Sequence, residues 1–486
     1  MNHDPDGTRL PIKLDTATNG EFAPIPLQRV HHQARYEAWH DATRHAKRLS
    51  LSRRSFLVSA CGAATTLLAM NRAYAAQGPR GSHFDVPSEA ALDMQIARST
   101  LDTGEFIFDV QGHFVNPTGA WTKTLPFGVE PFRSFAQNKQ CDALGKPGRA
   151  YMDCLNGEAF IKDVFLDSDT DLCVLSFVPS TRAGEPLTIE EAAATASIVE
   201  RMQGTHRLLL HGRVNPNQAG DVEAMDMLAS KYRIAAWKTY TQWGPDGEGF
   251  FLDDDVGLAF IERGRRLGVR NVAIHKGLPF GQRSYEHSTC VDVGRVAKRF
   301  PDVNFLVYHS GFVTEGKEGP YDPRRSDGID ALITSLQANG ISPGGNVYAE
   351  LGSTWRFLMR DPDAAAHAVG KLVKHVGEDN VLWGTDSIWY GSPQDQIQAF
   401  RTFQISDALV EKHGYPKMTP ALRAKIFGRN ALRVYAVPDD VVRKHVPRDR
   451  VAQARAAYRH QPDPTFRTYG PKTRREFLRF NAWSSA

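Results

Sequence analysis

The sequence lacks the marks of several protein classes. Its 486 residues include only five cysteines, and no two of them form a Cys-x-x-Cys pair, which argues against a thiolate zinc site and a disulfide-stapled fold. The net charge of +4 is too small over this length to indicate a nucleic-acid binder. No stretch reaches the roughly 20 apolar residues that a transmembrane helix needs. What remains is a chain of ordinary globular composition, long enough to bury a large core.

An export signal is predicted near the start of the chain. Arg53 and Arg54 stand directly before the apolar run 56–70, and the small residues Ala73 and Ala75 follow where a signal peptidase needs them. The pattern is typical of twin-arginine signals, and the alternative is an amphipathic helix with a chance arginine pair. We therefore expect the twin-arginine export machinery as a partner, cleavage after Ala75, and a periplasmic or secreted mature protein.

The cysteines outside this signal allow one possible disulfide. An oxidising compartment would allow Cys141 and Cys154 to pair, but the sequence does not decide it. Cys173 lies within an apolar run and is expected in the core.

Short apolar or β-branched runs alternate with segments of helical spacing. This alternation predicts βαβ units and a parallel sheet, and eight nearly continuous apolar runs favour a closed (β/α)8 TIM barrel. A doubly wound open sheet is the alternative, although no Gly-x-Gly-x-x-Gly follows an early strand. The expected strands are residues 106–114, 172–178, 208–214, 234–240, 271–276, 304–309, 346–351 and 381–386. The helical segments between them are residues 189–202, 222–231, 256–267, 291–300, 329–337 and 364–375.

The expected elements divide the chain into four parts. Residues 1–75 carry the export signal, 76–104 form a linker, and 105–437 form the barrel with a long insertion after its first strand. Residues 438–486 are a basic extension, with 11 Lys or Arg against 3 acidic residues from Val441 onward. Such a run is typical of a solvated face or a clamp on a neighbouring subunit, so a homo-oligomer stays open. No recognition motif accompanies it, and no nucleic acid is expected as a partner.

Candidate functional residues collect where the predicted strands end. The C-terminal ends of barrel strands share one mouth, where barrel enzymes place their chemistry. His113, His275 and Asp386 each end a different strand, so two imidazoles and a carboxylate could converge on one Zn, Mn or Fe(II) ion. Gln111 faces the same side as His113, because alternate residues of a strand do so. His309 ends a further strand.

The segments around these residues resemble a known family. The resemblance is to the metal-dependent amidohydrolase superfamily, in the amidohydrolase-related branch that also contains aminocarboxymuconate-semialdehyde decarboxylase and resorcylate decarboxylase. It covers roughly residues 105–437 and rests on five segments in family order. They are residues 108–113, 272–275, 305–311, 382–386 and 425–435.

The resemblance implies a role for each candidate residue. His113 and His275 would bind one divalent metal ion, with zinc expected first and manganese or iron as alternatives. Asp386 would bind the same ion and take a proton from bound water or substrate, while His309 would act as acid or base or polarise the substrate. A divalent ion lowers the pKa of bound water to near 7 and polarises a carbonyl, so such a site would act on a small-molecule substrate.

The chain departs from the family pattern at Gln111. The first-strand motif of the family reads His-x-His or Glu-x-His, whereas a carboxamide is neutral and a poorer ligand for these metals. Gln111 is therefore expected to be a weak or absent ligand. Three consequences stay open: a weakly held but more electrophilic ion, a hydrogen bond from Gln111 to substrate, or loss of the metal and a binding protein on the same barrel.

Four further residues outline the substrate. Binuclear members of the superfamily carry a carboxylated lysine at the position of Lys238, but that class needs both first-strand histidines, so Lys238 is expected to anchor an anion or form a salt bridge. Trp243, Trp355 and Trp389 follow strand ends and suggest a planar or aromatic substrate, with loop packing as the alternative. The expected function is hydrolysis of a small carbonyl or carboxylate compound by metal-activated water. Decarboxylation of an aromatic or unsaturated acid is the alternative.

Replacing Gln111 by histidine tests this departure. Gln111→His would restore the family's first-strand pair, and metal affinity should rise because imidazole is a better ligand than a carboxamide. Titration of the purified protein with Zn²⁺ or Mn²⁺ measures the affinity. An unchanged dissociation constant would place Gln111 outside the ligand shell.

Overall fold

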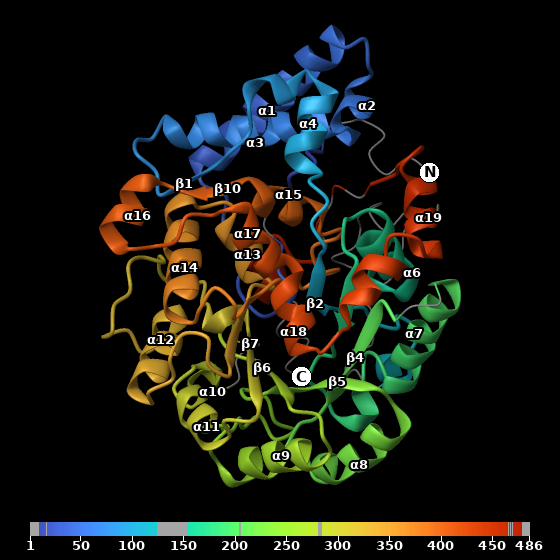
Figure 1. Ribbon diagram of the computed structural model, residues 1–486, viewed down its shortest axis with the longest axis vertical. Coiled ribbons are helices and arrows are strands. Elements are labelled where there is room, and N and C mark those ends of the chain that lie inside the picture. The colour runs from blue at the N-terminus through green and yellow to red at the C-terminus, as the bar shows by residue number, and fades with distance from the viewer. Residues whose placement is uncertain are drawn as a thin grey trace.

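A closed parallel barrel forms the centre of the molecule (Figure 1). The computed structural model describes residues 9–123 except 16, and 154–478 except 204–205, 280–283, 465, 467 and 469. Its eight barrel strands pair in chain order, and the predicted (β/α)8 fold and all eight expected strands are confirmed. They are β2 (Phe108–Gly112), β3 (Leu172–Leu175), β4 (Leu208–Arg213), β5 (Ile234–Tyr240), β6 (Asn271–His275), β7 (Asn304–Tyr308), β8 (Val347–Glu350) and β9 (Val381–Leu382).

The barrel closes where its first strand meets its last. The amide of Val110 donates to the carbonyl of Trp383 at 3.0 Å, and the amide of Asp386 donates to the carbonyl of Gln111 at 2.9 Å. Closure removes the free edges of the sheet. It also places the residues that follow β2 and β9 side by side.

Helices cover the outside of the barrel, and the six expected ones are present. They are α7 (Ile189–Gln203), α8 (Asp221–Lys231), α9 (Asp255–Arg266), α11 (Val293–Arg299), α12 (Gly328–Ala338) and α14 (Pro362–His375). Further α-helices among the described residues of this part are α6 (Gly157–Phe160), α10 (Tyr285–Ser288), α13 (Thr354–Leu358), α15 (Gln394–Thr402), α16 (Asp407–His413), α17 (Pro420–Ala424), α18 (Asn430–Val434) and α19 (Arg450–Tyr458). Their starts follow ordinary capping rules: the side chain of Asp361, for example, accepts from two amides of the first turn of α14, and Pro362 occupies the first helical position.

A helical layer lies outside the barrel, at the top of Figure 1. It is formed by α1 (Arg29–Arg48), α2 (Arg53–Val58), α3 (Ala60–Ala75) and α4 (Met94–Leu101). The apolar run of the predicted export signal is buried in this layer, with Phe56 and Leu67 fully shielded from solvent. Among the described residues, no helix combines the length and apolar character that a membrane crossing needs.

The stretch expected as a linker carries structure of its own. Besides α4 it contains β1 (Ser82–Phe84), which pairs antiparallel with β10 (Phe403–Ile405), a strand that follows the barrel. This small sheet fastens the helical layer to the barrel.

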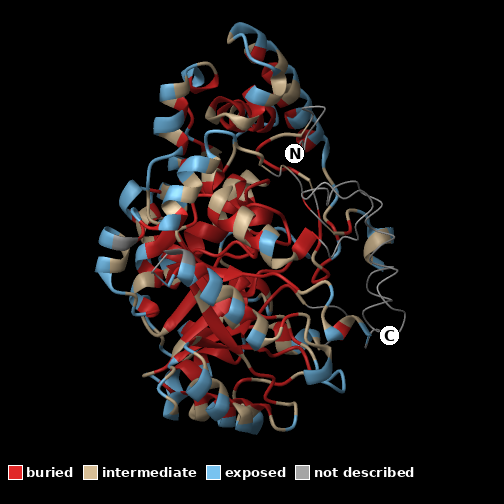
Figure 2. Ribbon diagram, turned by 90° about the vertical axis from the view of Figure 1, so that its right-hand side faces the viewer, coloured by how far each residue is buried: buried red, intermediate tan, exposed pale blue. Residues whose placement is uncertain are grey.

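The core fills the barrel (Figure 2). Inward residues of the strands, among them Phe108, Val110 and Tyr308, pack against Val434 and Tyr435 at α18. The helix thereby covers one end of the barrel. Cys173 is fully buried, as expected. Of the proposed disulfide, Cys154 is disulfide-bonded, and Cys141 lies outside the described residues.

The basic C-terminal extension binds its own barrel. Arg207, next to β4, forms a two-pronged ion pair with Asp449, Nε to Oδ2 at 2.6 Å and Nη2 to Oδ1 at 2.8 Å, and both side chains are buried. Farther along, Arg455 pairs with Asp171 at 3.2 Å, and Arg459 pairs with Asp169. Arg455 and Arg459 of the extension therefore face acidic side chains of the same chain.

Removing Asp449 should destabilise the fold strongly. Asp449→Ala would leave the guanidinium of Arg207 buried without its carboxylate, a change that costs about 3–5 kcal/mol in other proteins. Urea unfolding followed by circular dichroism measures the free energy of unfolding. The matched control is Asp439→Ala, at an exposed carboxylate of the same region, which should change the free energy by less than about 0.5 kcal/mol. Equal effects of the two substitutions would contradict the anchoring role.

Candidate functional site

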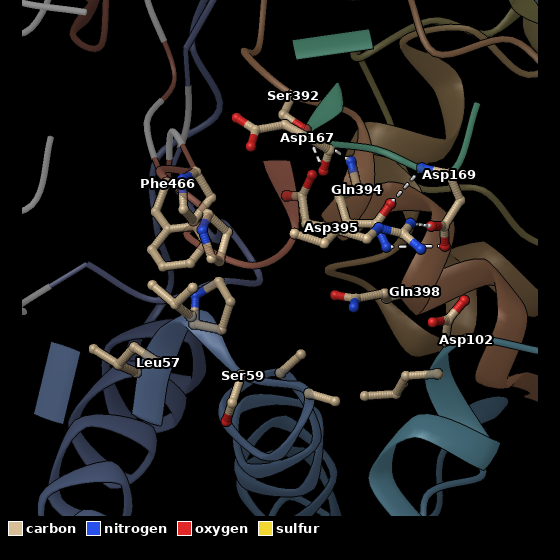
Figure 3. A pocket seen from close by; sticks show the side chains of 18 of the residues that line it. Leu57, Ser59, Asp102, Asp167, Asp169, Ser392, Gln394, Asp395, Gln398 and Phe466 are labelled. Atoms are coloured by element: carbon tan, nitrogen blue, oxygen red, sulfur yellow. Dashed lines mark hydrogen bonds and ion pairs between the residues drawn. The ribbon is translucent and has the colours of Figure 1, made fainter. Parts of the chain in front are cut away.

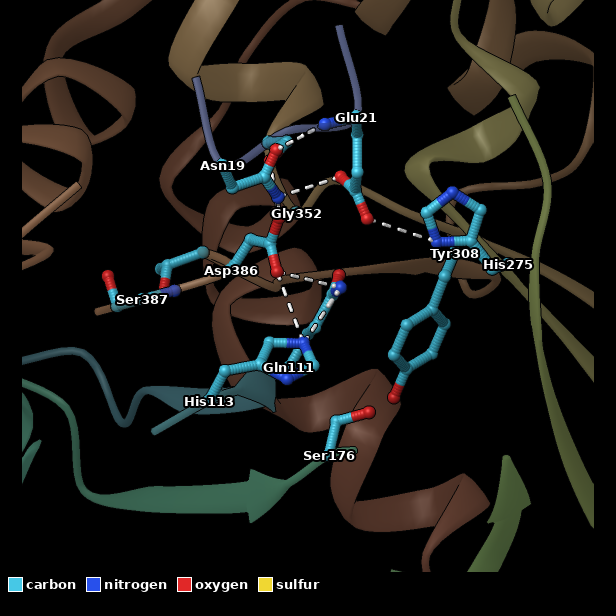
Figure 4. Close-up of polar contacts among 12 residues, drawn as sticks. Asn19, Glu21, Gln111, His113, Ser176, His275, Tyr308, Gly352, Asp386 and Ser387 are labelled. Carbon is cyan, nitrogen blue, oxygen red and sulfur yellow. Dashed lines mark hydrogen bonds and ion pairs between the residues drawn. The ribbon is translucent and has the colours of Figure 1, made fainter. Parts of the chain in front are cut away.

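The residues predicted at the strand ends form two groups, and Figure 4 shows the first of them together with His275. In the first group, Asp386 Oδ1 accepts a hydrogen bond from Gln111 Nε2 at 3.0 Å and lies 3.2 Å from His113 Nε2. Gln111 and His113 approach each other at 3.4 Å, as their shared side of the strand predicts. Barrel closure between β2 and β9 brings these three side chains together.

Asp386 carries negative charge in this setting. Burial by itself acts to raise the pKa of Asp386, but the hydrogen bond and charge of His113 bring that pKa below its usual value. The hydroxyl of Ser353 also donates to Asp386 Oδ2. The carboxylate is therefore held as an anion by its neighbours.

The second group is a pair of histidines. His275 Nδ1 and His309 Nε2 lie 3.2 Å apart, and the other nitrogen of each ring faces a backbone carbonyl. His275 Nε2 donates to Leu278 O at 3.0 Å, and His309 Nδ1 donates to Gly352 O at 2.7 Å. A carbonyl only accepts, so those outer nitrogens carry the ring protons.

The two nitrogens that face each other therefore carry lone pairs. Burial lowers the pKa of His309 to about 4 and lowers that of His275 well below its ordinary value, with the neighbouring His309 adding to the effect. Both rings are neutral at pH 7. Two lone pairs 3.2 Å apart repel each other unless a cation lies between them.

A segment from the start of the chain lies between the two groups (Figure 4). Glu21 Oε1 is 3.6 Å from His275 Nδ1. Asn19 Nδ2 donates to Glu21 Oε2 at 2.8 Å and lies 3.5 Å from Asp386 Oδ2. Among the described residues, Glu21, His275 and His309 form the group whose ligand atoms all lie within 4.8 Å of one another. Sequence reasoning missed Asn19 and Glu21, which lie in no expected element.

The backbone at the site is strained. His309, Ser353 and Asp386 adopt left-handed conformations, with φ of 64°, 54° and 59°, which cost about 1 kcal/mol or more for residues with a Cβ. These three residues follow the ends of β7, β8 and β9 within a few positions. The surrounding hydrogen bonds hold them in this conformation.

Two further buried acids support the site, and the sequence analysis missed both. Glu350 ends β8 and accepts from the amides of His309 and Gly352, and burial raises its pKa to about 8. Asp109 accepts from the amides of Gln111 and Thr385, and burial raises its pKa to about 7. Glu350 stands at the end of a predicted strand, so the rule that selected the histidines would have found it.

Lys238 has an unusual environment. Its side chain is fully buried, and its ammonium lies 3.9 Å from the centre of the Tyr308 ring and 4.6 Å from that of Tyr240. Among the described residues, Lys238 Nζ has no hydrogen-bond partner, and burial lowers its pKa to about 7. Lys238 already lies within the electrostatic reach of Glu350, Asp386 and Glu21, and that it anchors an anion stays a prediction.

The three expected tryptophans lie in different surroundings. Trp389 stacks on His113, with ring centres 5.4 Å apart, and so belongs to the site. Trp243 is buried in the loop after β5. Trp355 is surrounded by Phe400 and Phe403 and donates to a backbone carbonyl of α15, so loop and core packing accounts for it.

A cavity of about 590 Å³ lies elsewhere, between the helical layer and the loops of the barrel (Figure 3). Lys13, Asp167, Asp169, Asp395 and Phe466 are among its walls. The histidines and Asp386 do not line it. They are buried beneath the N-terminal segment instead.

The donor atoms at the histidine pair fit a divalent metal ion. Two nitrogens bound at about 2.0–2.1 Å to one tetrahedral ion would lie roughly 3.3 Å apart, close to the 3.2 Å observed. Imidazole and carboxylate are the ligands that Zn, Mn and Fe(II) accept. That His113 and Asp386 bind the same ion as His275 stays a prediction.

Gly384 is needed to hold Glu350 in place. A Cβ at position 384 would overlap the Glu350 carboxylate, so Gly384→Ala should displace it and lower the free energy of unfolding by about 1–3 kcal/mol. Gly319→Ala is the control, since a Cβ there meets nothing within 4 Å. Urea unfolding compares the two variants. If Gly384→Ala were as stable as the control, the packing of Glu350 against Gly384 would be refuted.

Comparison with known proteins supplies the family. No curated protein matches the chain. Solved structures with a similar fold include 5-carboxyvanillate decarboxylase from Sphingomonas paucimobilis, at 14% identity and a TM-score of 0.39, covering 69% of this chain and 100% of that one. An uncharacterised TIM-barrel protein from Bordetella bronchiseptica has 14% identity and a TM-score of 0.45, covering 68% of this chain and 98% of that one.

The family model described as Amidohydrolase matches residues 163–437, which is more than half of the chain. Its end coincides with the predicted end of the barrel at residue 437. The match begins after β2, so the placement of Gln111 and His113 at the mouth comes from the structure. The chain therefore belongs to the amidohydrolase family and is an enzyme.

Proposed function

We propose that the protein is a metal-dependent hydrolase acting on a small carbonyl or carboxylate compound. The observation that carries this proposal is the pair of facing lone pairs on His275 and His309, 3.2 Å apart, beside the carboxylate of Glu21. This arrangement disfavours a metal-free binding protein, because without a cation the two nitrogens only repel. Zinc is the first candidate, with manganese or iron(II) as alternatives.

Each residue of the site has its own role in the proposed reaction. A divalent ion bound at the site would lower the pKa of a bound water and polarise a substrate carbonyl. Asp386, held as an anion beside His113, is the general base that takes the proton. Burial beneath the N-terminal segment excludes bulk water and strengthens every electrostatic contact inside.

Lys238 and Trp389 are proposed to bind substrate. The buried ammonium of Lys238 lacks a hydrogen-bond partner and suits a carboxylate. Trp389, stacked on His113, offers a flat surface to a planar compound. Lys238 also supports a second candidate function, decarboxylation of an aromatic or unsaturated acid, because that substrate must carry a carboxylate.

Export through the twin-arginine machinery is a separate proposal, supported by the sequence pattern around Arg53 and Arg54. In the folded chain Arg53 lies over the ring of Trp39, and Arg54 pairs with Asp463 at 3.4 Å. Recognition of the two arginines would therefore require α2 to leave these contacts.

Asp386→Asn should abolish turnover. The substitution keeps the size of the side chain but removes the base, and general-base catalysis contributes about 10²–10⁴-fold. The measurement is kcat with Zn²⁺ or Mn²⁺ on a panel of aromatic acids and lactones, with CO2 release and incorporation of labelled water as separate readouts. CO2 release without incorporation of water oxygen into the organic product would assign the carboxy-lyase reaction in place of hydrolysis. Asp255→Asn, at an exposed position, is the control, and a near-normal kcat for Asp386→Asn would contradict the assigned role.

A further inference from the structure

The N-terminal segment, residues 9–26 apart from 16, is anchored across the mouth of the barrel. Arg356 donates to the backbone carbonyls of Lys13 and Asp15, and Arg360 donates to that of Leu14 at 3.1 Å. Both arginines are buried, and they bind the backbone of the segment whatever its side chains are.

Side chains add to this anchoring on both sides of Glu21. Lys13 Nζ pairs with Asp395 at 3.1 Å, with both groups buried. Phe22 packs edge-on against Phe357, with ring centres 4.5 Å apart. The position of Glu21 is thus fixed by its neighbours, and its carboxylate is not needed to hold the segment in place.

The contact between Glu21 and His275 is not a hydrogen bond. The 3.6 Å between Glu21 Oε1 and His275 Nδ1 exceeds a hydrogen-bond distance, and that nitrogen has no proton to give, because the ring proton lies on Nε2 toward Leu278. Two ligands of one ion, by contrast, lie about 3–4 Å apart without touching. The spacing suits a shared cation.

The orientation of the Glu21 carboxyl group points the same way. Its side chain is buried in the site. Its other oxygen is held by Asn19 at 2.8 Å, which directs Oε1 toward the histidines. The first strand offers only the neutral Gln111 where the family places a histidine or a glutamate.

We propose that Glu21 is a protein ligand of a divalent cation shared with His275 and His309. The N-terminal segment, which lies outside the family barrel, thereby supplies an anionic ligand that the first strand lacks. This inference rests on the proposed metal centre, but it concerns a residue that no family pattern contains. It also couples metal binding to closure of the barrel mouth.

The test measures metal affinity on the full-length chain, without any substrate. Zn²⁺ and Mn²⁺ are titrated against a competing chelator of known affinity, using wild type, Glu21→Gln and the control Glu89→Gln, which makes the same chemical change at an exposed position. Glu21→Gln keeps the size of the side chain and the anchors of the segment. We expect its affinity to fall at least tenfold, and that of the control to stay within twofold of wild type.

Two results distinguish failure of the Glu21 proposal from failure of the proposed metal centre. If wild type binds one ion and Glu21→Gln binds it equally well, Glu21 is not a ligand, while the metal centre stands. If wild type binds no ion, both proposals are overturned. Circular dichroism checks the folding of each variant.

A second variant tests the proposal if the Glu21→Gln protein does not fold. Glu21→Asp keeps the charge but shortens the reach by one methylene, so it should also weaken binding at least tenfold if direct ligation matters. Wild-type affinity in Glu21→Asp would overturn the proposal.

Discussion

Two lone pairs that face each other are the constraint on which this site depends. The tautomers of His275 and His309 are fixed by the carbonyls of Leu278 and Gly352, so neither ring can turn a proton toward the other. The left-handed backbone at His309 and the hydrogen bond from its amide to Glu350 keep the ring in this position. The two nitrogens therefore repel each other in the folded chain. A cation between them would remove this repulsion by binding to both.

The barrel could be read from the sequence because both faces of each strand are covered. Buried parallel strands appear as apolar runs, and helices of regular period separate them. The ends of these runs then selected His113, His275, His309 and Asp386, and the structure brings these residues into two contacting groups. The rule worked because the strand ends of a closed barrel share one mouth.

The sequence could not reveal the contribution of the N-terminal segment. Asn19 and Asp386 are 367 residues apart, and residues 9–26 have neither helical nor strand periodicity. Their position follows from buried arginines that bind backbone carbonyls, an interaction that does not depend on the side chains of the segment, and from the contacts of Lys13 and Phe22. Trp355 is a case where sequence position alone was misleading. It follows a strand, which suggested a place at the barrel mouth, but it packs against Phe400 and Phe403 in the core. Tertiary packing decides such cases.

The N-terminal segment connects metal binding with substrate access to the histidines and with the predicted export signal. Its described residues lie over the buried histidines, so we expect substrate access to require their movement, and a cation held by Glu21 would oppose that movement. The predicted signal begins farther along the chain, and cleavage after Ala75 would remove Glu21 together with the buried helices α2 and α3. A chain that keeps its first 75 residues would then hold its ion under a closed mouth. A processed chain would expose the histidines and Lys238 but would have to bind its ion with His113, His275, His309 and Asp386 alone. Glu21, which lies outside the barrel, would thus be a ligand in the unprocessed chain with its closed mouth and would be missing from the processed chain with its open mouth.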